Sequence, residues 1–283
     1  MAEATTTAPV ILSVRDLDVK FNLRGRVLNA IRGISLDLYQ GESLAIVGES
    51  GSGKSVFTKT FMGLLDQNGQ IAGGQILYNG MDLATFTTEK QWREIRGREI
   101  AMVLQDPMTS LNPLKTIGSQ IGEAIAIHQG LRGAALKSKV LECLGDVGIP
   151  DPESRYGQYP HEFSGGMRQR VVIAIAVACR PKILICDEPT TALDVTIQAQ
   201  ILSLLKDLKK KYDLTTIYIT HDLGVVANVA DRIAVMYAGD IVEIGSCEEV
   251  FYTPKHPYTW ALLSSLPQLG IKGQELYSIQ GAP

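Results

Sequence analysis

A short run of residues near the start of the chain has the composition and spacing of a loop that binds phosphate. It fits the pattern G-x-x-x-x-G-K-[ST] and consists of Gly48, Glu49, Ser50, Gly51, Ser52, Gly53, Lys54 and Ser55. The glycines allow successive backbone N–H groups to point inward at an anion, and a helix beginning near Lys54 adds the positive end of its dipole. Lys54 is predicted to reach the β- and γ-phosphates of ATP, and the Ser55 hydroxyl to bind Mg²⁺.

A second cluster of reactive groups lies at the end of an apolar segment. Ile183–Cys186 has the composition of a buried parallel strand and is followed by two carboxylates, Asp187 and Glu188. Ligands of α/β proteins bind at this edge of the sheet. We expect Asp187 to hold Mg²⁺ through water and Glu188 to act as the general base that polarises the attacking water.

The elements around the phosphate-binding pattern are those it requires. The apolar run Ser43–Val47 predicts a strand before the loop, and Val56–Leu65 has helical spacing after it. Further strands are predicted at Val10–Phe21, Leu36–Leu38 and Gln75–Tyr78, and Asn79–Gly80 is a strong turn signal. The N-terminal strands are therefore expected to form a small antiparallel sheet that extends to about Asp82.

The rest of the chain predicts a helical insertion followed by an α/β core. A strand at Ile100–Leu104 is followed by a loop from Pro107, and residues 108–170 are expected to form a helical subdomain. Its helices are predicted at Ile117–Gln129, Ala134–Val147 and Pro152–Tyr159. Strands at Ile183–Cys186, Thr216–Thr220 and Ile233–Tyr237 then alternate with helices at Gly165–Arg180 and Val195–Tyr212. This alternation indicates a parallel sheet with crossover helices, so the fold class is α/β.

The composition excludes several kinds of protein. With 45% hydrophobic and 20% charged residues, the 283-residue chain is expected to be folded, and its net charge of -3 argues against nucleic acid as a partner. The four cysteines form no CxxC pair and are expected to be reduced thiols of a cytosolic protein. The longest apolar stretch, Val171–Cys179, is far shorter than the ~20 residues that cross a bilayer. Residues 1–9 are interpreted as a flexible tail and not a signal peptide.

The segment Phe163–Arg170 carries the resemblance that specifies the class of ATPase. Its Phe-Ser-Gly-Gly-Met-Arg-Gln-Arg sequence resembles the Leu-Ser-Gly-Gly-Gln signature of the ATP-binding-cassette (ABC) ATPases. Ser164 is a good N-cap, and Gly165 and Gly166 leave the first N–H groups of the helix open to an anion. In the family this anion is the γ-phosphate of ATP held by the other subunit of a head-to-tail dimer. Met167 replaces the usual glutamine and removes a polar contact with ribose, a replacement that is usual in the peptide branch.

The remaining family positions follow in order, and the resemblance covers residues 10–245. It implies that Gln105 contacts Mg²⁺ near the docking site of the transmembrane partner and that Asp194 communicates across the dimer. It also implies that His221 holds the γ-phosphate and links it to Glu188, and that Phe21 stacks on adenine. The implied architecture is a P-loop, RecA-like parallel core with an antiparallel β subdomain and an α-helical insert.

Several segments resemble the ATPases of peptide and nickel importers in particular. They are the signature segment, Asp187–Thr196, Gln105–Pro113 and Lys255–Thr259. Many members of this branch carry a cysteine cluster for an iron–sulfur centre beyond a C-terminal Gly-x-Pro motif, whereas this sequence ends at Gly281-Ala282-Pro283. Either that segment was removed from the chain or this member lacks it, and no cluster is predicted within these residues. Residues 246–283 are expected to be a family-specific extension, in which Tyr258 and Trp260 either pack on the body or dimerise.

The resemblance implies a peripheral subunit on the cytoplasmic face of the membrane that powers uptake of oligopeptides or dipeptides. Its expected partners are a second ABC ATPase, in this branch commonly a paralogue, two permease subunits and, indirectly, an extracytoplasmic solute-binding protein. Import of nickel or another small solute is an alternative. A soluble ABC ATPase of DNA repair or translation is a second alternative. A third is a regulatory cassette that binds ATP without cleaving it, although the presence of Glu188 and His221 speaks against this third class.

Overall fold

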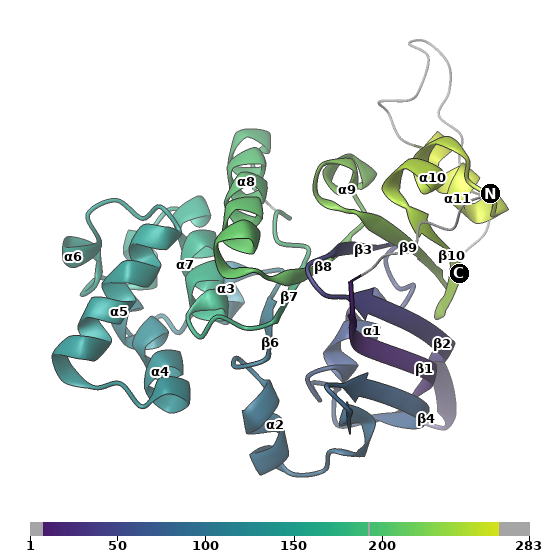
Figure 1. The fold of residues 1–283 in the computed structure, drawn as a ribbon, viewed down its shortest axis with the longest axis horizontal. Coiled ribbons are helices and arrows are strands. Elements are labelled where there is room, and N and C mark those ends of the chain that lie inside the picture. The colour runs from purple at the N-terminus through teal and green to yellow at the C-terminus, as the bar shows by residue number, and fades with distance from the viewer. Residues whose placement is uncertain (1–7, 192, 266–283) are drawn as a thin grey trace. The chain divides into compact units, whose positions relative to one another are not determined.

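The computed structural model describes residues 8–191 and 193–265 of the chain. They form two compact units (Figure 1): the first contains the residues up to Thr88 and from Ile217 onward, and the second is Glu89–Thr216. Most of the expected tail 1–9 and the end of the expected extension 246–283 lie outside the described residues.

The first unit contains an antiparallel sheet built from the N-terminal part of the chain. Along β1, the side chains of Leu12, Val14, Leu17 and Val19 are all buried, which fixes one face of the sheet against the core. The turn before β5 has positive φ at both Asn79 and Gly80, as the Asn-Gly pair predicts. The strand order is β2-β1-β4-β5, with bounds β1 (Val10–Leu23), β2 (Arg26–Tyr39), β4 (Gly69–Tyr78) and β5 (Met81–Asp82).

A bulge interrupts the pairing of β1 with β2. Val19 is opposite Ile31, but the next residue of β1, Lys20, is opposite Asn29. Ala30 is therefore an extra residue in β2. Bulges of this kind redirect the chain locally, and this one brings the Ala30 carbonyl toward the phosphate loop described below.

The first unit also contains the strand that leads into that loop. β3 (Ser43–Val47) is buried throughout and pairs in parallel with β9 (Arg232–Tyr237), which pairs in antiparallel with β10 (Asp240–Ser246). Residues from β3, β9 and the C-terminal helices share one apolar core, which includes Val47, Val235 and Tyr258. The helices of this unit are α1 (Lys54–Thr60), the 3-10 helix η1 (Leu83–Thr85), α9 (Leu223–Val229), α10 (Cys247–Tyr252) and α11 (Pro257–Ser264). β8 (Thr215–Thr220) begins in the second unit and ends in the first.

The second unit joins a pair of parallel strands to a group of helices. β6 (Ile100–Val103) and β7 (Ile183–Asp187) pair in register, with Val103 opposite Cys186. α7 (Gly165–Val177) contacts β6 as well as four other helices of this unit, so it connects the strands with the helical part; these helices are α3 (Pro107–Ser110), α4 (Ile117–Gln129), α5 (Gly133–Asp146) and α8 (Val195–Tyr212). The other elements are α2 (Glu89–Ile95), α6 (Pro152–Arg155) and the 3-10 helix η2 (Pro160–Glu162).

Several elements differ in extent from the prediction. The helix expected at Val56–Leu65 begins at Lys54 and ends at Thr60. It ends there because the chain turns: the Gly63 N–H donates a hydrogen bond to the Thr60 carbonyl, and Gly63 has a φ of 58°. The segment after Pro107, expected to be a loop, forms the single turn α3, in which proline occupies a first-turn position. α6 stops at Arg155, short of the expected Tyr159.

Candidate functional site

The phosphate-binding pattern forms the connection between β3 and α1, and two of its glycines occupy positions where a side chain would collide with backbone. Gly48 has a φ of 154°, and a Cβ there would lie 2.1 Å from the Met236 carbonyl oxygen. Gly53 has a φ of 103°, and its Cβ would lie 2.9 Å from the Ala30 carbonyl oxygen. Glycine is required at both ends of the loop for conformation and for space.

Two neighbouring segments of the first unit hold the loop in place. The Gly239 N–H donates to the Ser52 carbonyl at 3.0 Å, and the Arg32 N–H donates to the Gly239 carbonyl at 2.9 Å. The β9–β10 turn is thus bonded both to the loop and to β2 next to the Ala30 bulge. Ser52 itself is buried, so the loop is positioned by its surroundings as well as by its own sequence.

Lys54, the first residue of α1, curls back across the loop. Its Nζ donates to the carbonyl oxygens of Gly48 at 2.8 Å and Glu49 at 2.7 Å, and the residue is only 6% exposed. A buried ammonium group needs such oxygen partners. Phosphate oxygens offer the same group stronger, charge-assisted bonds, so this is the geometry of a lysine that exchanges carbonyls for an anion.

Phe21 lies near the end of β1, in the sheet whose bulge contacts the loop. It pairs with Leu28 on β2 and with Gly69 on β4, and a Cβ at Gly69 would lie 2.6 Å from the Phe21 ring. The ring therefore lies over the bare backbone of Gly69. Phe21 is half-buried, so part of the ring remains accessible for stacking.

In the second unit, the structure brings Gln105 and Glu188 together. They follow the carboxyl ends of β6 and β7, and because these strands are parallel and in register, both side chains emerge at one edge. Gln105 Nε2 donates to Glu188 Oε2 at 2.7 Å, and Thr191 Oγ1 donates to the same oxygen at 3.0 Å. Glu188 has a φ of 46°, a conformation that non-glycine residues seldom adopt and that recurs at active sites. Thr191 was missed by the sequence analysis, and its place three residues after Glu188 was the only signal.

Asp187 is the last residue of β7 and is 6% exposed. Its carboxylate, the amide of Gln105 after β6 and the hydroxyl of Ser55 in α1 are each oxygen donors of the kind that Mg²⁺ prefers. Ser55 belongs to the first unit, and Asp187 and Gln105 belong to the second. Among the described residues no group of three His, Cys, Asp or Glu side chains forms a metal cluster. A Mg²⁺ ion bound through one or two carboxylates and substrate phosphates requires no such cluster, so the donor set fits.

The signature segment forms the start of α7, as predicted. Ser164 is the N-cap, and its hydroxyl accepts from the Met167 N–H at 3.3 Å. Ser164 and Gly165 are exposed and Met167 is half-buried. Gly166 also has a packing role that the sequence analysis did not include, because a Cβ there would lie 2.8 Å from Ile197 Cγ2 on α8.

The two remaining predicted residues lie at the ends of elements. Asp194 caps α8, with its carboxylate accepting from the Ile197 N–H at 3.0 Å, and it is exposed. His221 directly follows β8 and is exposed. One contact to the phosphate loop was missed: the Glu49 N–H donates to the hydroxyl of Tyr258 at 3.1 Å.

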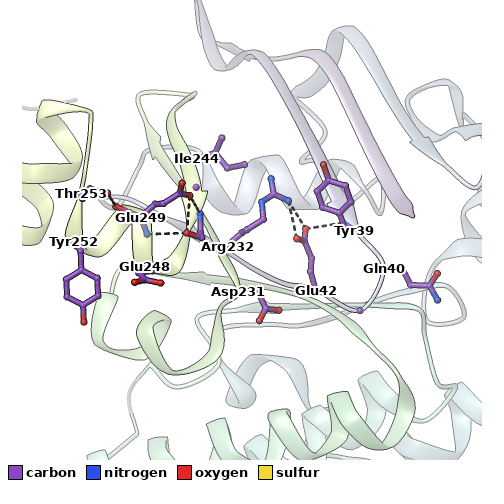
Figure 2. A pocket seen from close by; sticks show the side chains of 13 residues that line it. Tyr39, Gln40, Glu42, Asp231, Arg232, Ile244, Glu248, Glu249, Tyr252 and Thr253 are labelled. Atoms are coloured by element: carbon purple, nitrogen blue, oxygen red, sulfur yellow. Dashed lines mark hydrogen bonds and ion pairs between the residues drawn. The ribbon is translucent and has the colours of Figure 1, made fainter. Parts of the chain in front are cut away.

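A pocket of about 880 Å³ lies at the opposite ends of β3 and β9 from the phosphate loop (Figure 2). Its wall includes the ion pair of Arg232 with Glu42, at 3.1 Å. Burial raises the pKa of Glu42, although the Tyr39 N–H and the Arg232 guanidinium oppose this effect. Because ligands of parallel sheets bind at the carboxyl ends of strands, this pocket is not the nucleotide site.

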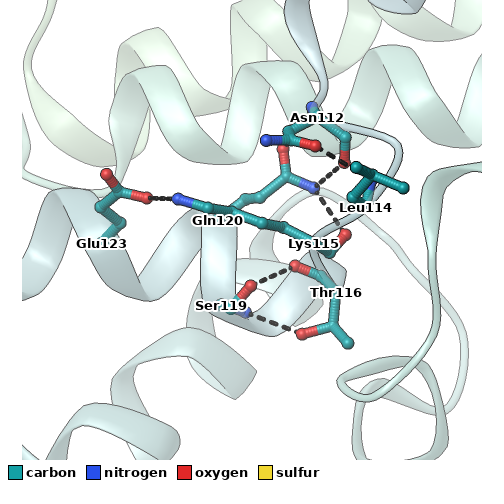
Figure 3. A network of polar contacts seen from close by, with 7 residues as sticks. All are labelled: Asn112, Leu114, Lys115, Thr116, Ser119, Gln120 and Glu123. Carbon is teal, nitrogen blue, oxygen red and sulfur yellow. Dashed lines mark hydrogen bonds and ion pairs between the residues drawn. The ribbon is translucent and has the colours of Figure 1, made fainter.

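A surface loop of the second unit, directly before α4, is held by a network of polar contacts (Figure 3). The Gln120 side chain accepts from the Asn112 N–H at 2.8 Å and donates to the carbonyls of Asn112 at 3.1 Å and Lys115 at 3.0 Å. Lys115 also pairs with Glu123 at 2.7 Å. Leu114 stands within this braced loop and is 85% exposed.

Comparison with known proteins gives matches over nearly all of the chain. The family model described as "ABC transporter" matches residues 31–191, and the model described as "Oligopeptide/dipeptide transporter, C-terminal region" matches residues 242–283. In the described part of the chain, no helix combines the length and the apolar character needed to cross a membrane.

Similar curated proteins come from several bacteria. The chain is 62% identical to the oligopeptide transport ATP-binding protein AmiE of Streptococcus pneumoniae, over 97% of this chain and 77% of that protein. It is 57% identical to OppD of Bacillus subtilis, an oligopeptide transport ATP-binding protein, over 96% of this chain and 76% of that protein. It is 55% identical to the dipeptide transport ATP-binding protein DppD of Bacillus subtilis, over 96% of this chain and 82% of that protein.

Solved structures with the same fold are nucleotide-binding cassettes. One is the dimeric post-hydrolysis state of the ATP-binding cassette MJ0796 bound to ADP and Pi, with a TM-score of 0.74 and 26% identity, covering 83% of this chain and 98% of that one. Another is cbiO1 from Clostridium perfringens, part of the ABC transporter complex cbiONQ, with a TM-score of 0.73 and 30% identity, covering 86% of this chain and 91% of that one.

Proposed function

Because the chain belongs to the ABC transporter family, we propose that it is the ATP-hydrolysing subunit of an importer that takes up oligopeptides or dipeptides. The match of residues 242–283 to the C-terminal region of oligopeptide and dipeptide transporters supports this class of solute. The observation that carries the nucleotide chemistry is the loop Gly48–Ser55, with its two obligatory glycines and a lysine curled over its carbonyls.

The phosphate loop binds the β- and γ-phosphates of ATP. The N–H groups of Gly51 and Gly53 face the anion, supported by Glu49, Ser50 and Ser52, and Lys54 leaves its carbonyl partners for phosphate oxygens. The accessible part of the Phe21 ring stacks on adenine, since every base offers a π face to an aromatic side chain.

The metal of this site is Mg²⁺, held by Ser55, Gln105 and, through water, Asp187. When bound, it neutralises charge on the β- and γ-phosphate oxygens. The position of Asp187 at the end of a buried strand, at the sheet edge, supports this role. No iron–sulfur centre is proposed.

Glu188 is the general base. Two donors, from Gln105 and Thr191, converge on its Oε2 and hold the carboxylate in place to accept a proton from the attacking water. His221 holds the γ-phosphate and links it to Glu188. Glu188, His221 and Gln105 together act on one water molecule and one phosphoryl group.

The nucleotide site is completed by a second cassette in a head-to-tail dimer. Ser164, Gly165, Gly166 and Met167 of one chain face the γ-phosphate bound to the other, and Asp194 communicates between the two sites. The exposure of Ser164 and Gly165 at the capped start of α7 supports this arrangement, as does the dimeric, ADP-bound state of the similar cassette MJ0796. We propose a paralogue of this chain as the second cassette, since the peptide branch commonly pairs two different ATPases, and a second copy of this chain is the alternative.

The dimer works on the cytoplasmic face of the membrane with two permease subunits and, indirectly, an extracytoplasmic solute-binding protein. The segment from Gln105 to the braced loop at Leu114 receives short cytoplasmic helices of the permease. Residues 10–245 form the ATPase domain, with a helical subdomain at about 108–170, and the extension begins at 246.

The test is peptide uptake into vesicles that contain the assembled transporter, with Lys54→Ala in this chain. Uptake and ATP binding by this chain are expected to fall together. Uptake of nickel, or no uptake of any solute together with binding to DNA or ribosomes, would overturn the proposal. Lys59→Ala, which changes a lysine of the same helix outside the loop pattern, is the control.

A further inference from the structure

The C-terminal region of the chain packs against the strands that lead into the phosphate loop. Tyr258, the second residue of α11, is 8% exposed and lies in a core cluster with Val47, the residue directly before the loop, and Val235. Its ring lies 4.5 Å from the ring of Tyr237 at the end of β9, measured between centroids. The ring is therefore fixed in place next to the loop.

The Tyr258 hydroxyl contacts one particular peptide group of the loop. The peptide that joins Gly48 to Glu49 donates its N–H to Tyr258 at 3.1 Å and accepts from Lys54 Nζ, through its C=O, at 2.8 Å. A peptide unit is planar, so fixing its N–H direction also fixes its C=O direction. Tyr258 and Lys54 are thus connected through a single rigid group.

This peptide needs an external anchor because it follows a glycine. Gly48 has no Cβ and so restricts its own backbone torsions little. The hydroxyl is suited to the task because it is neutral: burial raises the pKa of Tyr258, although the bond from the Glu49 N–H acts in the opposite direction.

The start of α11 is itself tied to the body of the first unit. Glu243 on β10 accepts from the N–H groups of Lys255 at 2.7 Å and His256 at 3.0 Å, and His256 Nδ1 accepts from the Tyr258 N–H at 3.1 Å. A series of hydrogen bonds therefore leads from β10 through the start of α11 to the loop.

We propose that Tyr258 is a positioning residue for ATP binding, and that through it the C-terminal extension sets the position of the Gly48–Glu49 peptide and of Lys54. The inference rests on the proposed nucleotide role of the loop. Without the hydroxyl, the peptide reorients more freely and Lys54 is less well placed for phosphate. Loss of the hydroxyl is expected to lower the affinity for nucleotide and to leave the chemical step unchanged, because the hydrogen bonds from Gln105 and Thr191 to Glu188 remain.

The test is Tyr258→Phe in the assembled transporter, which removes one hydroxyl and keeps the ring. The KM for ATP, and the dissociation constant for a fluorescent ATP analogue, are expected to rise about 2- to 10-fold, the range for one lost hydrogen bond. The kcat should change less than 2-fold. Tyr252→Phe is the matched control, since Tyr252 lies in the same extension but is 81% exposed.

Thermal unfolding without nucleotide separates positioning from a merely structural role. Similar melting temperatures for the two variants, with the KM raised only in Tyr258→Phe, support the inference. Equal KM values in both variants, or a lower kcat at unchanged KM, would overturn it. If the wild-type chain binds no ATP, it is the proposed function that fails, and the two failures are therefore distinguishable.

Discussion

Gln105 and Glu188 lie 83 residues apart in the sequence, yet Gln105 Nε2 donates a 2.7 Å hydrogen bond to Glu188 Oε2. Each residue follows the carboxyl end of a strand, and the two strands are parallel neighbours in register. Thr191 donates to the same oxygen, so the carboxylate is held from two sides. This pair makes Glu188 the group on which the proposed hydrolysis depends.

Glu188→Gln should retain ATP binding and lose turnover. The amide keeps the shape of the side chain but cannot accept a proton from water, so kcat is expected to fall by about 100-fold or more. Phosphate release and binding of a fluorescent ATP analogue, measured on the assembled transporter, separate the two effects. Glu153→Gln, a change at an exposed glutamate of the same unit, is the control. Full activity in Glu188→Gln would remove Glu188 from the role of base.

Thr191→Val should weaken catalysis more mildly. The substitution keeps the volume but removes the hydroxyl that donates to Glu188 Oε2, and one hydrogen bond to a charged group corresponds to roughly a ten-fold loss in kcat. Thr196→Val, at an exposed position of α8, should leave kcat unchanged. If the two valine variants turn over ATP equally fast, Thr191 does not position the base.

The two glycines of the signature segment should respond differently to alanine. A Cβ at Gly166 collides with Ile197, so Gly166→Ala is expected to lower the free energy of unfolding by about 1 to 3 kcal/mol. A Cβ at Gly165 is 3.9 Å from its nearest neighbour, so Gly165→Ala should unfold at the same urea concentration as the wild type and still lose ATPase activity. Normal ATPase activity in Gly165→Ala would contradict the proposed contact with a neighbour's phosphate.

Leu114→Glu should impair assembly with the permease and spare ATP binding. Leu114 is 85% exposed on a loop braced by Gln120, so a charge there disturbs an apolar contact without disturbing the fold. Ile127→Glu, at a 59% exposed position of α4, is the control. Co-purification with the permease subunits is the measurement, and equal recovery of both variants would exclude Leu114 from the docking surface.

Much of this architecture was predictable because local patterns were strong. β3 was predicted at Ser43–Val47 and α8 at Val195–Tyr212, with the bounds found in the structure, since the first is an unbroken apolar run and the second has long helical periodicity. Ser164 was predicted as an N-cap from its residue type, and its side chain does accept from the backbone. The ABC class, the α/β fold and the peptide branch are confirmed by the matching families and structures.

The sequence did not predict the first half of β2 or the contact of Tyr258 with Glu49, because no local pattern indicates either of them. The first half of β2 lacks alternation, because Val27 and Leu28 are adjacent and both exposed, so only Leu36–Leu38 was predicted as strand. Tyr258 reaches Glu49 across 209 positions, and nothing near either residue indicates the other. Of the two tail aromatics, Tyr258 packs on the body of the first unit, whereas Trp260 is 54% exposed, and its contact with a second chain stays a prediction.

The most direct test compares hydrolysis by single chains with hydrolysis by paired ones. Phosphate release per chain is measured at a concentration where sedimentation shows only monomers, and again with the partner cassette in excess. We expect release to be nearly absent in monomers, to appear with the partner, and to be lost from the partner's nucleotide site when this chain carries Ser164→Arg. An equal rate per chain in strict monomers would contradict a nucleotide site completed by a neighbouring cassette.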